Sequence, residues 1–98
     1  MAADSISTLD EPGRTVNLFD LLSDETRLRI VDELYHMDQP AIRFSELARR
    51  VEAGDPGRFN YHLKRLQEQL VIKTDGGYRL SDDGERIAQA VFATVSSR

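Results

Sequence analysis

The sequence predicts a small, mostly α-helical domain that carries one β-hairpin near its C-terminal end. Over most of residues 16–95, apolar residues recur at intervals of three and four, the spacing of amphipathic helices. The exception is LVIKTDGGYRL, residues 70–80, in which β-favouring residues flank Asp-Gly-Gly, a strong tight-turn signal. At 98 residues, the chain has the length of one domain and is too short for two ordinary ones.

The first part of the chain predicts a tail followed by two helices. Residues 1–14 are rich in Asp, Ser, Thr, Pro and Gly, so we expect a flexible tail there and the domain over residues 15–98. Residues 16–22 form a short apolar helix. Ser23 is a candidate N-cap for the next helix, because acidic residues follow it in the first turn. The buried stripe of that helix is Leu28, Val31, Leu34 and Tyr35.

The middle of the chain predicts two helices joined by a tight turn. Residues 42–44 are a brief extended piece, and Ser45 is the expected cap of a short helix. Residues 52–57, EAGDPG, have the composition of a turn, and Pro56 suits the start of the helix expected over residues 57–69. The core-facing stripe of that helix is Phe59, Leu63, Leu66 and Leu70, with His62 packed at its edge.

The last third predicts a hairpin and a final helix. The hairpin spans residues 71–80, with Ile72 and Leu80 facing inward and Lys73 and Arg79 facing outward. Ser81 is the expected cap of the final helix, whose apolar face is Ile87, Ala88, Val91, Phe92 and Val95. A short helix, a tight turn, a longer helix and a small hairpin are together the layout of a winged helix-turn-helix. We therefore expect about five helices and a two- or three-stranded wing.

Charge is unevenly distributed along the chain. The net charge is −4, but it is −6 over residues 1–42, +3 over residues 43–65 and −1 over residues 66–98. The acidic total argues weakly against a polyanionic partner, whereas the basic stretch favours one, because nearby charges set the field at a bound phosphate. Eleven of the thirteen basic residues are Arg, and Asp outnumbers Glu ten to seven. This bias is typical of proteins from salt-loving archaea, or of a high-GC genome.

The basic stretch predicts a DNA-reading surface on helix 57–69. The major groove of B-DNA admits one α-helix, and residues near the N-terminal end of the second helix of a helix-turn-helix reach base edges. Arg binds guanine and Asn binds adenine in bidentate fashion, whereas Lys and Arg further along contact phosphates. Ser45 on the supporting helix and the hairpin cations are further backbone contacts. The full predicted set is Ser45, Arg58, Asn60, Tyr61, Lys64, Arg65, Lys73 and Arg79.

Several function classes find no support in the sequence. There is no cysteine, and the two histidines, His36 and His62, do not form a pair at metal-ligand spacing. The sequence has no Gly-rich phosphate loop and no nucleophile elbow. It has no secretory signal and no apolar run of the ~18 residues that a membrane span needs. We therefore expect a cytoplasmic protein without a cofactor, a metal site, a membrane partner or an enzymatic activity.

Three stretches carry a family resemblance. LSDETRLRIVDEL, FSELARRV and FNYHLKRLQEQLVIKTDGGYRLSDDGERIA resemble the opening, supporting and recognition helices, wing and final helix of ArsR-type winged-helix regulators. The resemblance covers residues 16–95, and it is strongest to small regulators of halophilic archaea that share FNYHL. It implies a homodimer that binds double-stranded DNA and regulates transcription. It also implies a dimer interface on the first and last helices, formed by Leu18, Phe19, Ile87, Val91, Phe92 and Val95.

Two departures keep other hypotheses open. Many ArsR-type proteins sense metals through Cys or through His and Asp clusters, and this chain has no such set, so we predict no metal sensing. Winged helices also bind proteins, and a charged helix face is often only solvated. The alternatives are therefore a protein–protein interaction module without sequence-specific DNA binding, and a helper subunit with weakened DNA binding inside a hetero-oligomer.

Overall fold

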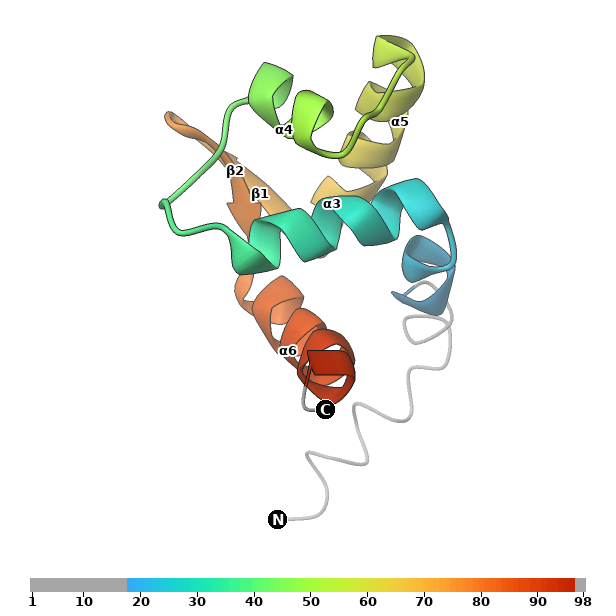
Figure 1. Cartoon of the computed structure of the whole chain (residues 1–98), viewed down its shortest axis with the longest axis vertical. Helices are drawn as coiled ribbons and strands as arrows, with labels where there is room; N and C mark the ends of the chain where they lie inside the picture. Colours follow the sequence, from blue (N-terminus) through green and yellow to red (C-terminus); the bar gives the residue numbers. More distant parts are fainter. Residues whose placement is uncertain (1–17, 97–98) are drawn as a thin grey trace.

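The computed structural model describes residues 18–96, with side chains described through residue 93. The predicted tail, residues 1–14, and Val16 lie outside the described residues. Within them, the chain is mostly helical with one antiparallel hairpin, which confirms the predicted fold class. The elements are a short helical segment over residues 18–22, α3 (Glu25–His36), α4 (Phe44–Arg50), α5 (Pro56–Gln67), β1 (Val71–Thr74), β2 (Gly77–Leu80) and α6 (Asp82–Ser96) (Figure 1).

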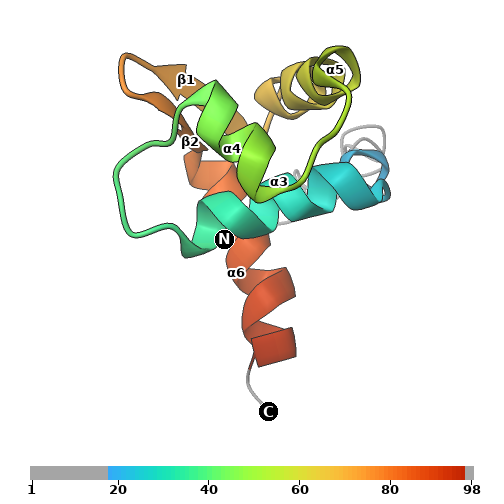
Figure 2. The same cartoon turned by 45° about the horizontal axis from the view of Figure 1, so that its top comes forward.

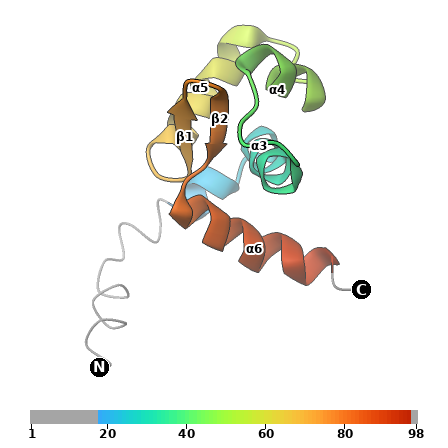
Figure 3. The same ribbon diagram turned by 90° about the vertical axis from the view of Figure 1, so that its left-hand side faces the viewer.

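Helix α3 lies in the middle of the molecule and contacts α4, α5, β2 and α6. The pair α4 and α5 and the hairpin lie on one side of α3, and α6 lies on the other (Figure 1). The C-terminal half of α6 extends away from the other elements (Figure 2). The hairpin stands over the start of α6 (Figure 3). This is a winged helix-turn-helix arrangement, with α4 and α5 as the helix pair and the hairpin as the wing.

One hydrophobic core joins all of these elements. The predicted stripe of α5 is confirmed, because the side chains of Phe59, Leu63 and Leu66 are at most 1% exposed. The ring of Phe44, at the start of α4, packs edge-on against Phe59 with 5.0 Å between ring centroids. Ile42 is fully buried as well. The core therefore holds α5 by one face and leaves its opposite face outward.

Two of the predicted helix caps are wrong, and the third is confirmed. Asp24, not Ser23, caps α3, since its carboxylate accepts the Arg27 backbone N–H at 3.1 Å, whereas the Ser23 hydroxyl donates to the Asp20 carbonyl. Ser45 caps no helix, because α4 already begins at Phe44 and its N-cap residue makes no side-chain hydrogen bond. The Ser81 hydroxyl accepts the Gly84 N–H at 2.9 Å, as a cap of α6 should.

The hairpin differs from the prediction in two respects. Lys73, expected to face outward, pairs with the buried Tyr78 and lies on the inner face of the hairpin, although its own side chain is exposed. Val71 pairs with Leu80 and both are buried, whereas Ile72 pairs with Arg79 on the other face of the hairpin. The predicted inward orientation of Ile72 is therefore wrong, because paired residues in an antiparallel ladder share a face. Ile42 extends the hairpin through one bridge to Tyr78, with backbone hydrogen bonds of 3.0 and 2.8 Å. The wing thus has two strands and a single-residue third edge.

Candidate functional site

Helix α5 presents a polar, basic face at the surface. Asp55 caps the helix by accepting the Gly57 N–H at 3.1 Å, and Pro56 occupies its first turn. One buried stripe fixes the rotation of the helix, so the remaining positions point outward. Arg58, Asn60 and Lys64 are exposed, and within the described part of the chain their side chains make no hydrogen bond or ion pair.

Tyr61 and Arg65 belong to the same face but are not equally available. Tyr61 is 53% exposed, which is unusual for a large aromatic side chain. Arg65 Nη2 donates to the carboxylate of Asp20 at 2.9 Å, and Arg65 Nη1 lies 3.5 Å from the hydroxyl of Tyr61. These hydrogen bonds with Tyr61 and Asp20 raise the pKa of Arg65 above its ordinary value. Arg65 is therefore engaged by neighbouring side chains, in contrast to Arg58 and Lys64.

The remaining predicted contacts lie on α4 and on the wing. Ser45 is exposed in the first turn of α4. Lys73 and Arg79 are both exposed but lie on opposite faces of the hairpin, because Lys73 pairs with Tyr78 and Arg79 pairs with Ile72. The Lys73 ammonium lies 5.9 Å from the centroid of the Tyr78 ring. In Figure 1 the turn of the hairpin lies at the left and the start of α5 at the right, both in the upper part of the view.

The sequence interpretation missed a buried polar contact beneath this face. Arg27 is only 7% exposed, and its guanidinium bonds to the ring of His62 on α5. Burial lowers the pKa of His62, and the charges of Arg27, Arg58 and Arg65 lower it further against the opposing pull of Asp24. A sequence signal existed, since Arg27 lies three residues before Ile30 on the buried face of α3.

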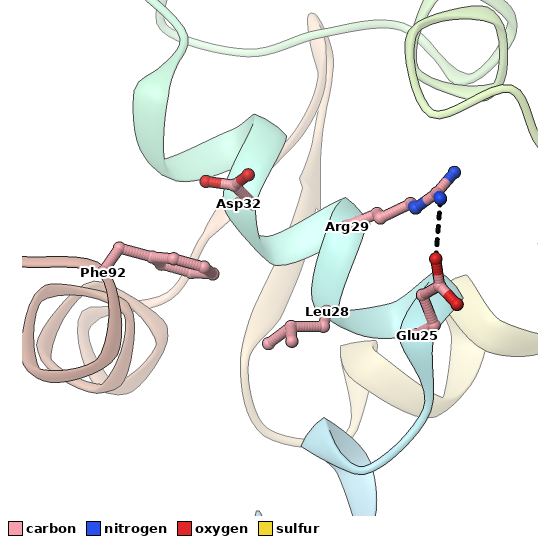
Figure 4. Close-up of a pocket in the computed structure, with 5 residues that line it drawn as sticks. All are labelled: Glu25, Leu28, Arg29, Asp32 and Phe92. Atoms are coloured by element: carbon pink, nitrogen blue, oxygen red, sulfur yellow. Dashed lines mark hydrogen bonds and ion pairs between the residues drawn. The ribbon is translucent and has the colours of Figure 1, made fainter. Parts of the chain in front are cut away.

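A cleft lies between α3 and α6. It has a volume of about 240 Å³ and an apolar floor of Leu28 and Phe92 (Figure 4). Each carboxylate on its rim has a cationic or titratable neighbour. Glu25 pairs with Arg29 at 2.6 Å, and Asp32 lies 2.8 Å from the Nδ1 atom of His36 on the same helix. The cleft thus has an apolar floor and a rim that carries Glu25, Arg29 and Asp32.

The predicted dimer residues divide into exposed and core-packed groups. Phe19 is 71% exposed and Val91 is 36% exposed. Leu18, Ile87 and Phe92 are partly buried against the core. The side chain of Val95 lies outside the described part. Two of the predicted residues are therefore exposed, and three contribute to the core of the described chain.

The fold and the exposed basic face of α5 define a winged helix-turn-helix domain whose second helix is basic on its outer side. Residues 15–91 match the profile of a family described as a domain of unknown function, DUF7347. The match covers more than half of the chain, and the protein belongs to this family. No curated protein and no solved structure matches the chain.

Among the described residues, no helix combines the length and the apolar composition that a membrane span requires. Nor do they contain a group of three or more His, Asp or Glu side chains placed to hold a metal ion.

Proposed function

We propose that this protein is a sequence-specific transcriptional regulator that binds double-stranded DNA as a homodimer, as the resemblance to ArsR-type regulators implies. The observation that carries the proposal is the outer face of α5. Arg58, Asn60 and Lys64 are exposed there without a hydrogen-bond or ion-pair partner among residues 18–93, on the second helix of a helix-turn-helix. Arg58 and Asn60 lie near the N-terminal end of α5, where side chains of these types are suited to base contacts, and Lys64 in its last turn is suited to a phosphate contact.

In this proposal α5 enters the major groove and the other elements bind the backbone. Arg58 reads guanine through O6 and N7, and Asn60 reads adenine through N6 and N7. Lys64 and Arg65 contact phosphates, and Tyr61 packs on a thymine methyl group or donates to a phosphate. Ser45 on α4 and Lys73 and Arg79 on the wing are the further backbone contacts. Arg65 breaks its ion pair with Asp20 and binds a phosphate instead. Breaking this pair costs little free energy, because an exposed ion pair is weak in water.

The net negative charge of the chain is compatible with DNA binding by α5. The Debye length is about 8 Å at physiological salt, so charges elsewhere on the molecule act weakly at the groove. Higher salt screens the acidic residues further. Residues 43–65 carry the positive charge that a bound phosphate meets.

A salt titration tests the phosphate contact of α5. Lys64→Ala should lower the slope of log affinity against log salt concentration by about one, equally for all sequences, because one fewer counterion is released. Binding is measured by fluorescence anisotropy with random-sequence duplexes. Arg86→Ala is the matched control, since Arg86 lies on α6 with its side chain 72% exposed. An equal change of slope in both variants would show that Lys64 makes no phosphate contact of its own.

The dimer is tested separately. Replacing Phe19 and Val91 with Ser should raise the dimer dissociation constant at least about tenfold, because burying one large apolar side chain contributes about 1.5–3 kcal/mol. Sedimentation velocity at micromolar concentrations measures this constant. Tyr61→Ser is the control, since it removes an exposed aromatic side chain from α5 and should leave the dimer intact. A wild-type protein that stays monomeric and still binds DNA fully as one unit would contradict the proposal.

The alternative is a winged-helix module that binds a protein. The acidic net charge of the chain favours it. For such a module, the salt dependence of DNA binding would not change on substitution of Lys64. Substitution of Arg58 or Asn60 would cause no sequence-dependent loss of DNA affinity.

A further inference from the structure

Arg27 ties three segments together beneath the outer face of α5. Its Nε donates to the carbonyl of Leu21 at 2.7 Å, and its Nη2 donates to the carbonyl of Asp20 at 3.2 Å. Its Nη1 lies 2.9 Å from Nδ1 of His62. The side chains of Arg27 and His62 are both buried. One guanidinium on α3 thus fixes the helical segment 18–22 and the middle of α5.

The chemistry of this contact sets the protonation state of His62. A guanidinium has five N–H donors and no acceptor, so Nδ1 of His62 must accept. The imidazole is therefore neutral, with its proton on Nε2. That atom faces Oδ1 of Asp24 at 3.8 Å. A second proton, placed on Nδ1, would set two donors and two positive charges against each other at hydrogen-bond distance.

The groups around His62 come from each element that packs against it. Asp20 belongs to the segment 18–22 and binds Arg65, and Asp24 and Arg27 belong to the start of α3. Arg58, Arg65 and Tyr61 lie on α5 itself, and the Tyr61 ring centroid is 5.3 Å from that of His62. Three cations and two carboxylates therefore surround one neutral imidazole, whose neighbour Tyr61 is on the proposed DNA face.

We propose that Arg27 and His62 are positioning residues for α5, and that a proton added to His62 opens their contact and weakens DNA binding. The inference rests on the proposed function, because it takes DNA as the partner of α5. Bidentate base contacts require close alignment of Arg58 and Asn60 with base edges, so a shift of α5 reduces affinity. Burial, which lowers the pKa of His62, is consistent with a contact that stays closed at neutral pH.

Thermodynamic linkage between proton binding and folding gives the direction in which stability and DNA affinity change with pH. Because the His62 pKa is lower in the folded than in the unfolded chain, the unfolded chain takes up its proton first as the pH falls below about 6.5. The free energy of unfolding therefore falls from that pH down to the folded-state pKa. Below the folded-state pKa, the affinity for DNA falls by up to about tenfold per pH unit. Protonation of the surface carboxylates acts in the opposite direction, since it makes the protein less acidic.

The chain contains only two histidines, so a matched pair of variants isolates the effect. His62→Asn retains an acceptor near the Nδ1 position but cannot be protonated, and His36→Asn removes the exposed histidine of α3. Affinity for a fixed duplex is measured from pH 7.5 to 4.5 at constant salt, with each protein normalised to its own value at pH 7.5. Wild type and His36→Asn should lose affinity on acidification. His62→Asn should keep its affinity or bind more tightly. Identical profiles for all three proteins would overturn the proposal.

A second readout needs no DNA. ¹⁵N NMR of the wild-type imidazoles should show His62 as the Nε2–H tautomer, with titration that shifts the backbone amides of α5. An Nδ1–H tautomer, or titration without an α5 response, would overturn the proposal even if His62→Asn fails to fold. If the protein binds no duplex at any pH while the α5 response is present, the proposed DNA function fails and the positioning contact stands.

Discussion

Replacement of Arg58 or Asn60 with alanine is expected to remove the sequence preference of DNA binding at the base pair that each side chain contacts. One bidentate contact to a base discriminates by about 1–3 kcal/mol, so each variant should bind the preferred site roughly 5- to 150-fold more weakly. Both side chains are exposed at the start of α5 and are held outward by the buried stripe beneath them. The loss should be confined to one position of the half-site for each variant.

The controls for this prediction lie on the same helix and on α6. Gln67→Ala removes an exposed amide from the far end of α5, and Arg86→Ala removes an exposed guanidinium from α6. Both should retain the sequence preference. Competition between the preferred duplex and single-base variants measures it. A uniform loss over all duplexes for Arg58→Ala and Asn60→Ala would assign these residues to the phosphate backbone instead of the bases.

The second large effect is expected from Gly84→Ala in the first turn of α6. A Cβ atom at this position would overlap the carbonyl oxygen of Leu70 and lie 3.2 Å from Cβ of Leu80. The same carbonyl accepts the N–H of Ser81 at 2.9 Å, and the Ser81 hydroxyl donates to Gln69, so the backbone cannot retreat without losing hydrogen bonds. Overpacking of this kind costs about 1–3 kcal/mol or more.

Thermal unfolding measures this cost against a matched glycine. For a domain of this size, 1 kcal/mol corresponds to roughly 4–8 °C in Tm. Gly57 also lies in a first helical turn, but a Cβ there would have ordinary contact, 3.6 Å from Asp55 Oδ1. Gly57→Ala should therefore leave Tm unchanged or raise it slightly, because alanine favours helices. A Gly84→Ala protein as stable as the wild type would show that α6 does not approach the end of α5 this closely.

The elements of the fold could be predicted because local patterns encode them. The spacing of Phe59, Leu63 and Leu66 fixes which side of α5 is buried, and the structure confirms it. The Asp-Gly-Gly turn gives the hairpin over residues 71–80, and the extended piece at Ile42 joins its edge. Periodicity and turn composition depend only on neighbouring residues, so one sequence suffices for them.

Features that depend on contacts between distant segments could not be predicted. The ion pair of Arg65 with Asp20 joins residues 45 positions apart, and Arg27 meets His62 across 35 positions. The glycine at position 84 is explained only by its close approach to the carbonyl of Leu70, fourteen positions earlier. Asp24 caps α3 in place of Ser23, whose hydroxyl donates to the carbonyl of Asp20 in the preceding helical segment.

The candidate site was predicted as a set of side chains, and their exposure could be inferred from the same stripe. Arg58, Asn60 and Lys64 lie where the sequence predicted. The distribution of Lys73 and Arg79 on opposite faces of the wing could not be inferred, because a shift of one residue in register exchanges the two faces of a strand. The partner of this surface stays a prediction.

Selection from a pool of random duplex DNA, followed by sequencing, tests the central claim most directly. It is carried out with the folded wild-type protein at a low and a molar salt concentration. The proposed function predicts enrichment of a palindromic motif whose half-sites lie about one helical turn apart, because two recognition helices are related by a two-fold axis. No enrichment at either salt concentration would contradict it and would make the outer face of α5 a protein-binding or simply solvated surface.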